Sequence, residues 1–268
     1  MLTLTRRAHT STIPLECDRL TPNHLASLTL AEIAALPLIH GNRREPLHQF
    51  FEVAGDPRDG TITFRGDLRL AKYLGAGMTT GSVIIEGDVG MHAGAQMTGG
   101  SLVIHGNAGD WLGAEMTGGS IHVHGNTGGQ VGAAYRGAIR GMNGGTILID
   151  GSAGDEVGLI MRRGMIVIGG DCGEYAGASM IAGTIIVRGQ AGRRCGAGMK
   201  RGTIVTWQTP ELSPGFSPSC RYRPSYVGLL RGELHRLGVA VEPIGMVDCY
   251  RGDVVHQGTG ELLVVTGP

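Results

Sequence analysis

The chain of 268 residues is long enough to bury a sizeable core, and its 23 basic and 23 acidic side chains cancel. This balance gives no overall attraction to nucleic acid or to an anionic membrane surface. No stretch approaches about 18 uninterrupted apolar residues, and the N-terminus lacks the apolar segment of a secretory signal. The five cysteines form no C-x-x-C pair, so we expect a reduced, cytoplasmic protein.

Residues 1–65 form a non-repetitive N-terminal cap with short helices and a strand. Thr21, which a proline follows, predicts the start of one short helix, because proline is favoured in the first helical turn. Thr29 and Glu32 have the spacing of a capping box and predict the start of a second helix. The stretch PLHQFFEVAGD, at 46–56, is expected to form a strand that leads into the next segment.

Residues 66–207 repeat one pattern, in which a methionine and a glycine recur three residues apart. The interval between repeats is nineteen residues except once, where the insertion AAYRGAIRG at 133–141 lengthens it. Such repetition indicates a solenoid, because each unit buries its apolar face only against its neighbours. Seven repeats keep both positions, which are Met78, Met97, Met116, Met142, Met161, Met180 and Met199, and Gly81, Gly100, Gly119, Gly145, Gly164, Gly183 and Gly202.

Each repeat holds one short β-branched run after its glycine, such as SVIIE at 82–86 and TIIVR at 184–188. These runs predict strands, and nineteen residues cannot hold two packed helices. We therefore predict a mainly β fold, a single-stack, right-handed parallel β-helix of about seven coils with small α/β flanking segments. The glycines are expected at corners with positive φ, and the methionines in the interior, with a metal-ligating methionine stack as the alternative.

Alternation along the strands separates an inner from an outer face. The positions expected to point inward are Val83/Ile85, Leu102/Ile104, Ile121/Val123, Ile147/Ile149, Ile166/Ile168, Ile185/Val187 and Ile204/Thr206. The outward positions are apolar in six of seven repeats, namely Ile84, Val103, His122, Leu148, Val167, Ile186 and Val205. An exposed stripe of this length is a liability for a monomer, so we expect the flanking segments, a partner chain or both to cover it.

Residues 208–268 form a C-terminal extension with one helix and a strand pair. A Pro/Ser-rich connector at 208–220 precedes a predicted helix within 225–238, and the strand pair is expected around 253–265. Both flanks are expected to cap the ends of the rod, which solenoids need for solubility.

Sites with a recognisable chemical pattern are scarce. The G-x-G-x-x-x-G stretches at 75–81 and 196–202 are one residue longer than a dinucleotide fingerprint, and the repeat accounts for both of them. Neither a Ser/His/Asp order nor a pair of carboxylates stands out, and we expect Cys172 and Cys195 to be packing residues. We therefore predict no catalytic residue.

Three histidines are expected to lie close together, since His105 and His124 are equivalent in adjacent coils and His122 is near them in sequence. Imidazoles in such an arrangement could begin a metal site. The equivalent position in the other repeats, which together form one column, holds Glu86, Asp150, Gly169 and Arg188. This mixture is typical of a solvated corner, and there is no third column of metal ligands beside it. We therefore predict no bound metal.

Basic residues are concentrated in the last coils. A stack of guanidinium groups there could hold a polyanion, whereas solvated corners or salt bridges to a partner are the alternative. The insertion brings Tyr135, Arg136 and Arg140 out of the rod, a combination that resembles an interface anchor, with loop drift as the alternative. The basic set is Arg162, Arg163, Arg188, Arg193, Arg194, Lys200 and Arg201.

The repeat G-x-x-G-x-x-x-G-A-x-M-x-x-G-x-I-x-V-x-G resembles the glycine-rich β-helix in the C-terminal part of glutamate synthase, where the rod belongs to a far larger chain. The seven repeats, the short N-terminal segment and the total length are more similar to the C subunit of formylmethanofuran dehydrogenase. The bacterial relative of that protein is the C subunit of the formyltransferase/hydrolase complex.

This resemblance implies a non-catalytic scaffold in tetrahydromethanopterin- and methanofuran-linked one-carbon metabolism. It implies hydrolase-like and formyltransferase subunits as partners, neither nucleic acid nor membrane, and no catalytically bound cofactor on this chain. The small number of lysines favours the bacterial complex, and a tungsten or molybdenum formylmethanofuran dehydrogenase or a stand-alone β-helix enzyme acting on a polyanion remains the alternative. A further hypothesis is that the polyglutamate tail of a methanofuran-like cofactor contacts Arg162, Arg163, Arg193, Arg194, Lys200 and Arg201.

Overall fold

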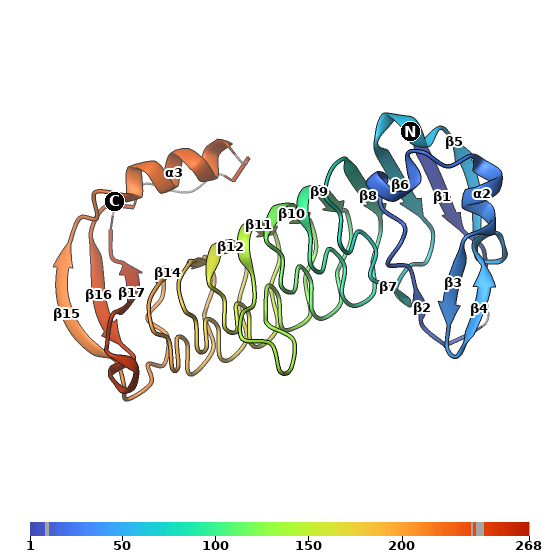
Figure 1. Ribbon diagram of the computed structural model, residues 1–268. Helices are drawn as coiled ribbons and strands as arrows, with labels where there is room; N and C mark the ends of the chain where they lie inside the picture. Colours follow the sequence, from blue (N-terminus) through green and yellow to red (C-terminus); the bar gives the residue numbers. More distant parts are fainter. Residues whose placement is uncertain (9–10, 237, 240–243, 268) are drawn as a thin grey trace.

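The computed structural model describes residues 1–8, 11–236, 238–239 and 244–267. It is mainly β, and its largest element is a sheet of 13 strands that runs through the whole elongated molecule (Figure 1). The N-terminal segment lies at one end of this rod and the C-terminal strands lie at the other. No helix of the described ranges is long and apolar enough to span a bilayer.

The central strands of the large sheet are parallel and follow one another in chain order. Each pairs with the strand of the next repeat, so that Val83 lies beside Leu102, and Leu102 beside Ile121. A second parallel ladder of single bridges joins Leu68, Val89 and Ala108 along another side of the coils. This pairing fits a β-helix. The strands are β6 (Thr61–Arg65), β8 (Ser82–Glu86), β9 (Thr98–Ile104), β10 (Gly118–Val123), β11 (Asn143–Ile149), β12 (Arg163–Ile168), β13 (Thr184–Val187) and β14 (Thr203–Thr206).

At the N-terminal end, β1 (Leu2–Arg6) continues the large sheet by pairing with β6, and β5 (Phe51–Gly55) closes it in antiparallel orientation. The helices are α1 (Pro22–Leu25) and α2 (Leu30–Ala35), and the capping box of α2 is present. The strand predicted for 46–56 is half correct, because Leu47–Gln49 form the 3-10 helix η1. The cap also holds η2 (Pro57–Asp59) and the strands β4 (Arg43–Pro46), β3 (Pro37–His40) and β2 (Leu15–Glu16), more strands than the one we predicted. These three strands form a second sheet with β7 (Ala71–Lys72), which belongs to the repeat segment.

At the C-terminal end, β17 (Gly260–Val265) adds to β14 in parallel, and β16 (Val247–Gly252) and β15 (Ser217–Tyr222) follow in antiparallel order. Helix α3 (Val227–Arg236) forms within the predicted stretch. The strand pair predicted for 253–265 is wrong in its first half. Val254–His256 form the 3-10 helix η3, because the Asp253 carboxylate accepts a hydrogen bond from the Val255 N–H at 3.1 Å.

The interior of the rod is built from the repeated columns. All seven column methionines have no exposed surface, and all seven column glycines have positive φ, between 79° and 114°. The inward strand positions are buried as well, so both predictions are confirmed. Stacking places each side chain over its equivalent in the next coil, which gives the close packing on which a solenoid depends.

The outer apolar stripe is covered only along the later coils. Leu148, Val167, Ile186 and Val205 are at most 6% exposed, in an apolar cluster that also contains Leu234 of α3 and residues of β16 and β17. Helix α3 runs back alongside the rod from its C-terminal end (Figure 1). At the earlier positions, Ile84, Val103 and His122 stay partly exposed. The C-terminal extension therefore covers about half of the stripe.

Candidate functional site

Four of the six basic residues predicted to hold a polyanion share one corner of the rod. Arg162 and Arg163 follow a column methionine at the start of β12, and Lys200 and Arg201 occupy the same positions two coils later. Two strand spacings correspond to about 10 Å. Arg162 is half-buried and the other three are exposed, and no ion pair within the described ranges involves them. Their charge is therefore free to meet an external anion.

The other two, Arg193 and Arg194, lie at a different corner and already have partners one coil earlier. The guanidinium group of Arg193 donates to Oε1 of Glu174 from two nitrogens, at 2.6 and 2.9 Å. Arg194 lies over the ring of Tyr175, with its guanidinium carbon 5.3 Å from the ring centroid, and donates to the hydroxyl group of that tyrosine. The structure thus places the six predicted residues at two corners of the rod.

A cluster of His122, His124 and Asp150 spans β10 and the end of β11. Nε2 of His122 lies 3.0 Å from Oδ1 of Asp150, and Nδ1 of His124 lies 2.7 Å from Oδ2. The ring of His105 stacks on His124, with centroids 5.1 Å apart. Asp150 belongs to the same column as His105 and His124, which we interpreted as a solvated corner, and the structure brings its carboxylate against both His122 and His124.

The three ligand atoms of this cluster lie within 4.8 Å of one another, which suits a metal such as Zn²⁺ that binds imidazole and carboxylate. Burial raises the pKa of Asp150, but hydrogen bonds from His122 and His124 lower it by more, so the carboxylate is charged at neutral pH. All three side chains are at least 32% exposed, and exposed ion pairs of this kind contribute at most about 1 kcal/mol. The cluster could hold a metal, and without one it is a weak surface network.

An aromatic column lies at a corner of the early coils. Tyr73, His92 and Trp111 occupy the same position in successive repeats, with ring centroids 4.5 Å apart for the first pair and 6.3 Å for the second. All three have φ between 62° and 64°, but the residues at this position in the later coils also have positive φ. The backbone conformation therefore belongs to the corner, whereas consecutive aromatic rings occur only in these three coils, with Tyr175 as a single aromatic residue at the same position later.

The insertion folds back onto this aromatic column. The ring of Tyr135 stacks on Trp111 at 5.0 Å, and its hydroxyl group lies 2.9 Å from Nδ1 of His92. The backbone N–H of Tyr135 donates to Oε1 of Glu115 at 3.2 Å. The insertion is therefore anchored to the two preceding coils through Tyr135. Our expectation that Tyr135 extends out of the rod is wrong, whereas Arg136 and Arg140 are exposed as expected.

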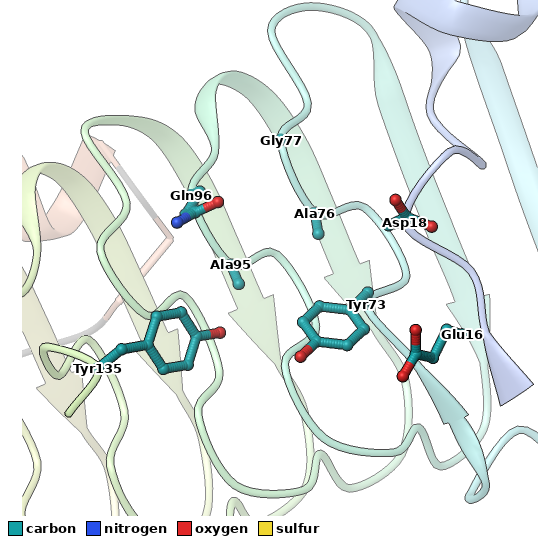
Figure 2. A pocket seen from close by; sticks show the side chains of 8 residues that line it. All are labelled: Glu16, Asp18, Tyr73, Ala76, Gly77, Ala95, Gln96 and Tyr135. Carbon is teal, nitrogen blue, oxygen red and sulfur yellow. The ribbon is translucent and has the colours of Figure 1, made fainter. Parts of the chain in front are cut away.

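A cavity of about 560 Å³ opens between this corner and the N-terminal cap (Figure 2). Tyr73 lies between Tyr135 on one side and Glu16 and Asp18 on the other. Burial raises the pKa of Tyr73, and the nearby carboxylates of Glu16 and Asp18 raise it further. The remaining lining residues are Ala76, Gly77, Ala95 and Gln96.

Cys172 and Cys195 are packing residues, as predicted. Cys172 is 4% exposed and Cys195 is fully buried. Burial raises the pKa of Cys195 to about 12 and also raises that of Cys172. Neither thiol is therefore an available nucleophile at neutral pH.

No family model matches the chain. Curated relatives include the C subunit of the molybdenum-containing formylmethanofuran dehydrogenase 1 of Methanothermobacter thermautotrophicus, 45% identical over 80 residues. The C subunit of the tungsten-containing formylmethanofuran dehydrogenase 2 of the same organism is 40% identical over 84 residues. Each match covers 30% of this chain and spans only 20% and 31%, respectively, of the relative.

A solved structure matches over the full length. It is a chain in the crystal structure of the formyltransferase/hydrolase complex (FhcABCD) of Methylorubrum extorquens with methylofuran, 33% identical, with a TM-score of 0.90. The alignment covers 99% of this chain and 100% of that one. The chain belongs to the C-subunit family of formylmethanofuran dehydrogenases and formyltransferase/hydrolase complexes.

Several features of this C-subunit family member were not predicted from the sequence. The aromatic column could have been found by aligning position 73 with positions 92 and 111 in the nineteen-residue repeat. The carboxylates of Glu16 and Asp18 carried no sequence signal, because their place beside Tyr73 depends on the pairing of β2 with β7.

Proposed function

We propose that the chain is a non-catalytic scaffold in a cytoplasmic formyltransferase/hydrolase complex of methanofuran-linked one-carbon metabolism. The observation that carries this proposal is the full-length match to a chain of FhcABCD at a TM-score of 0.90. In such an assembly the chain is a seven-coil, right-handed rod, and hydrolase-like and formyltransferase subunits bind to it.

The chemistry of the surface supports a scaffold. The buried thiols of Cys172 and Cys195 are inaccessible, and the Asp150 carboxylate is engaged by two histidines. The partly exposed apolar residues Ile84 and Val103 continue the stripe that the C-terminal extension covers further along the rod. A partner protein that buries them would remove this exposed apolar surface.

The test is co-purification of the tagged chain from its own host, followed by native mass spectrometry and an assay of formyl transfer and hydrolysis. We expect the chain in a complex with several other subunits, activity in the complex, and none in the isolated chain. Turnover by the isolated chain, or a chain that purifies alone, would contradict the scaffold function.

A dehydrogenase complex is the second candidate, because the 45% identical relative belongs to a molybdenum-containing formylmethanofuran dehydrogenase. Elemental analysis of the purified complex separates the two. Stoichiometric tungsten or molybdenum, together with iron, would indicate the dehydrogenase, and their absence from an active complex would indicate the formyltransferase/hydrolase.

We further propose that the basic corner of Arg162, Arg163, Lys200 and Arg201 contacts the polyglutamate tail of a methanofuran-like cofactor. These four cations point to an anionic polymer, because carboxylates form strong charge-assisted hydrogen bonds with guanidinium groups. Arg193 and Arg194 take a smaller share, since Glu174 and Tyr175 already occupy them.

Charge reversal tests this contact in the assembled complex. Arg162→Glu with Arg163→Glu should weaken cofactor retention by about tenfold or more, since a hydrogen bond to a charged group contributes roughly 1.5–3 kcal/mol. Arg193→Glu with Arg194→Glu should weaken retention less. The matched control is Arg43→Glu with Arg44→Glu, an exposed pair on β4. Unchanged retention in the first variant would overturn the proposal.

A further inference from the structure

The cavity beside the aromatic column has an unusual combination of walls. Two phenol rings, Tyr73 and Tyr135, stand beside it, and its charged lining residues are Glu16 and Asp18, both negative (Figure 2). Glu115 lies just behind Tyr135 and Gln96, and accepts a hydrogen bond from each. The wall is therefore aromatic and anionic at once.

Aromatic faces and carboxylates attract the same kind of ligand. The quadrupole of an aromatic ring attracts cations to its face, and carboxylates attract them by charge and hydrogen bonding. Lys72, the basic residue next to Tyr73, is not part of the lining. A guanidinium group suits this combination better than an ammonium group, because it stacks on rings and binds carboxylates through two parallel hydrogen bonds.

The insertion indicates that the occupant belongs to a protein. Its residue Ile139 is 75% exposed, and Arg136 and Arg140 near it are also exposed. Tyr135, which lines the cavity, holds this loop against His92 and Trp111, so the exposed isoleucine stands on the same anchored insertion as one wall of the cavity. A buried aromatic or arginine anchor next to an apolar contact is the usual composition of an interface centre.

We propose that this cavity receives an arginine side chain from a neighbouring protein of the complex, with its guanidinium group between the ring of Tyr73 and the carboxylates of Glu16 and Asp18. The inference rests on the proposed scaffold function, because it needs an assembled complex. It adds a specific docking point at the N-terminal end of the rod, away from the basic corner of the late coils.

The main test is the double variant Glu16→Lys with Asp18→Lys, measured in the complex reconstituted from the tagged chain and the other subunits. We expect the dissociation constant of this chain from the complex to rise about tenfold or more. The matched control is Glu52→Lys with Glu211→Lys, two exposed acidic residues away from the cavity, which should change it less than twofold. The folded content of both variants is compared by circular dichroism.

A photocrosslinking amino acid at position 136 identifies the occupant. In the native complex we expect a crosslink to an arginine-containing peptide of another protein in the assembly, and we expect the Glu16→Lys/Asp18→Lys variant to lose it. A crosslink to peptides without arginine, or an unchanged dissociation constant in a well-folded variant, would overturn the inference.

Two other outcomes are decisive. If the isolated chain binds arginine amide in calorimetry through Glu16 and Asp18, but assembly is unaffected, the site takes a small organic cation and docking of a neighbouring protein is overturned. If the wild-type chain joins no other protein, the scaffold function fails and this inference fails with it. If the Glu16→Lys/Asp18→Lys variant assembles normally, only the arginine-docking inference fails and the scaffold function stands.

Discussion

The close contact between stacked coils can be tested at two glycines with the same backbone conformation. One of them lies against the neighbouring coil, and the other faces open space. Gly119 is a column glycine with φ of 86°, and a Cβ atom there would lie 2.8 Å from the carbonyl oxygen of Gly100 in the preceding coil. Gly137, on the insertion, has φ of 88°, and a Cβ atom there would meet nothing within 4 Å. Alanine at either position has the conformational cost of a non-glycine residue at positive φ, but only Gly119→Ala also forces two backbones apart.

The expected magnitudes follow from these distances. An alanine at positive φ costs about 1–2 kcal/mol, which is the whole expected loss for Gly137→Ala. Crowding against a backbone that cannot move aside costs about 1–3 kcal/mol more, so Gly119→Ala should lose about 2–5 kcal/mol. Urea unfolding, followed by circular dichroism and by tryptophan fluorescence to check that the transitions coincide, measures both losses. Equal losses in the two variants would show that the coils do not touch at this corner.

The remaining predictions concern the thiols and the C-terminal cover. Cys220 is the exposed cysteine, and the other four cysteines are buried. A thiol reagent should therefore react rapidly with one group in the folded protein and with the other four only after unfolding. Rapid reaction of all five thiols would contradict this packing. Leu234→Ala should destabilise the docking of α3 by about 2–5 kcal/mol, because this side chain is fully buried against the outer stripe. Limited proteolysis should then cleave the C-terminal extension faster than in the wild type, and an unchanged cleavage rate would refute that role.

The features that could be predicted from the sequence are those fixed by the repeat or by neighbouring residues in the chain. The inward burial of Val83 and Ile85 and the positive φ of Gly81 follow from a period that fixes both the strand and its corner. The capping box of Thr29 and Glu32 was equally local and is present. These features need only neighbours in the chain or one repeat away.

Features that depend on contacts between distant segments could not be predicted in the same way. Val167 and Ile186 are buried in a cluster with residues of α3, β16 and β17, and nothing in the sequence of these elements states which face of the rod they meet. The contacts of Asp150 with His122 and His124 cross the longest interval of the repeat. Asp150 shares its column with His124, but His122 lies two positions earlier in its coil, so the column alone does not show that the three side chains meet. Residues 253–256 contain two adjacent valines, yet the side chain of Asp253 bonds to the backbone there and competes with strand formation.

The parallel strands follow one another in chain order, so the length of the rod depends on the number of repeats. Because each repeat advances the sheet by one strand spacing, a whole nineteen-residue unit added between β12 and β13 would move the two capped ends apart by about 4.8 Å. Every face would keep its alignment, since the added unit would restore the same columns. The number of repeats therefore sets the separation of whatever binds near the two termini, and evolution can adjust that distance in steps of one repeat without redesigning either end.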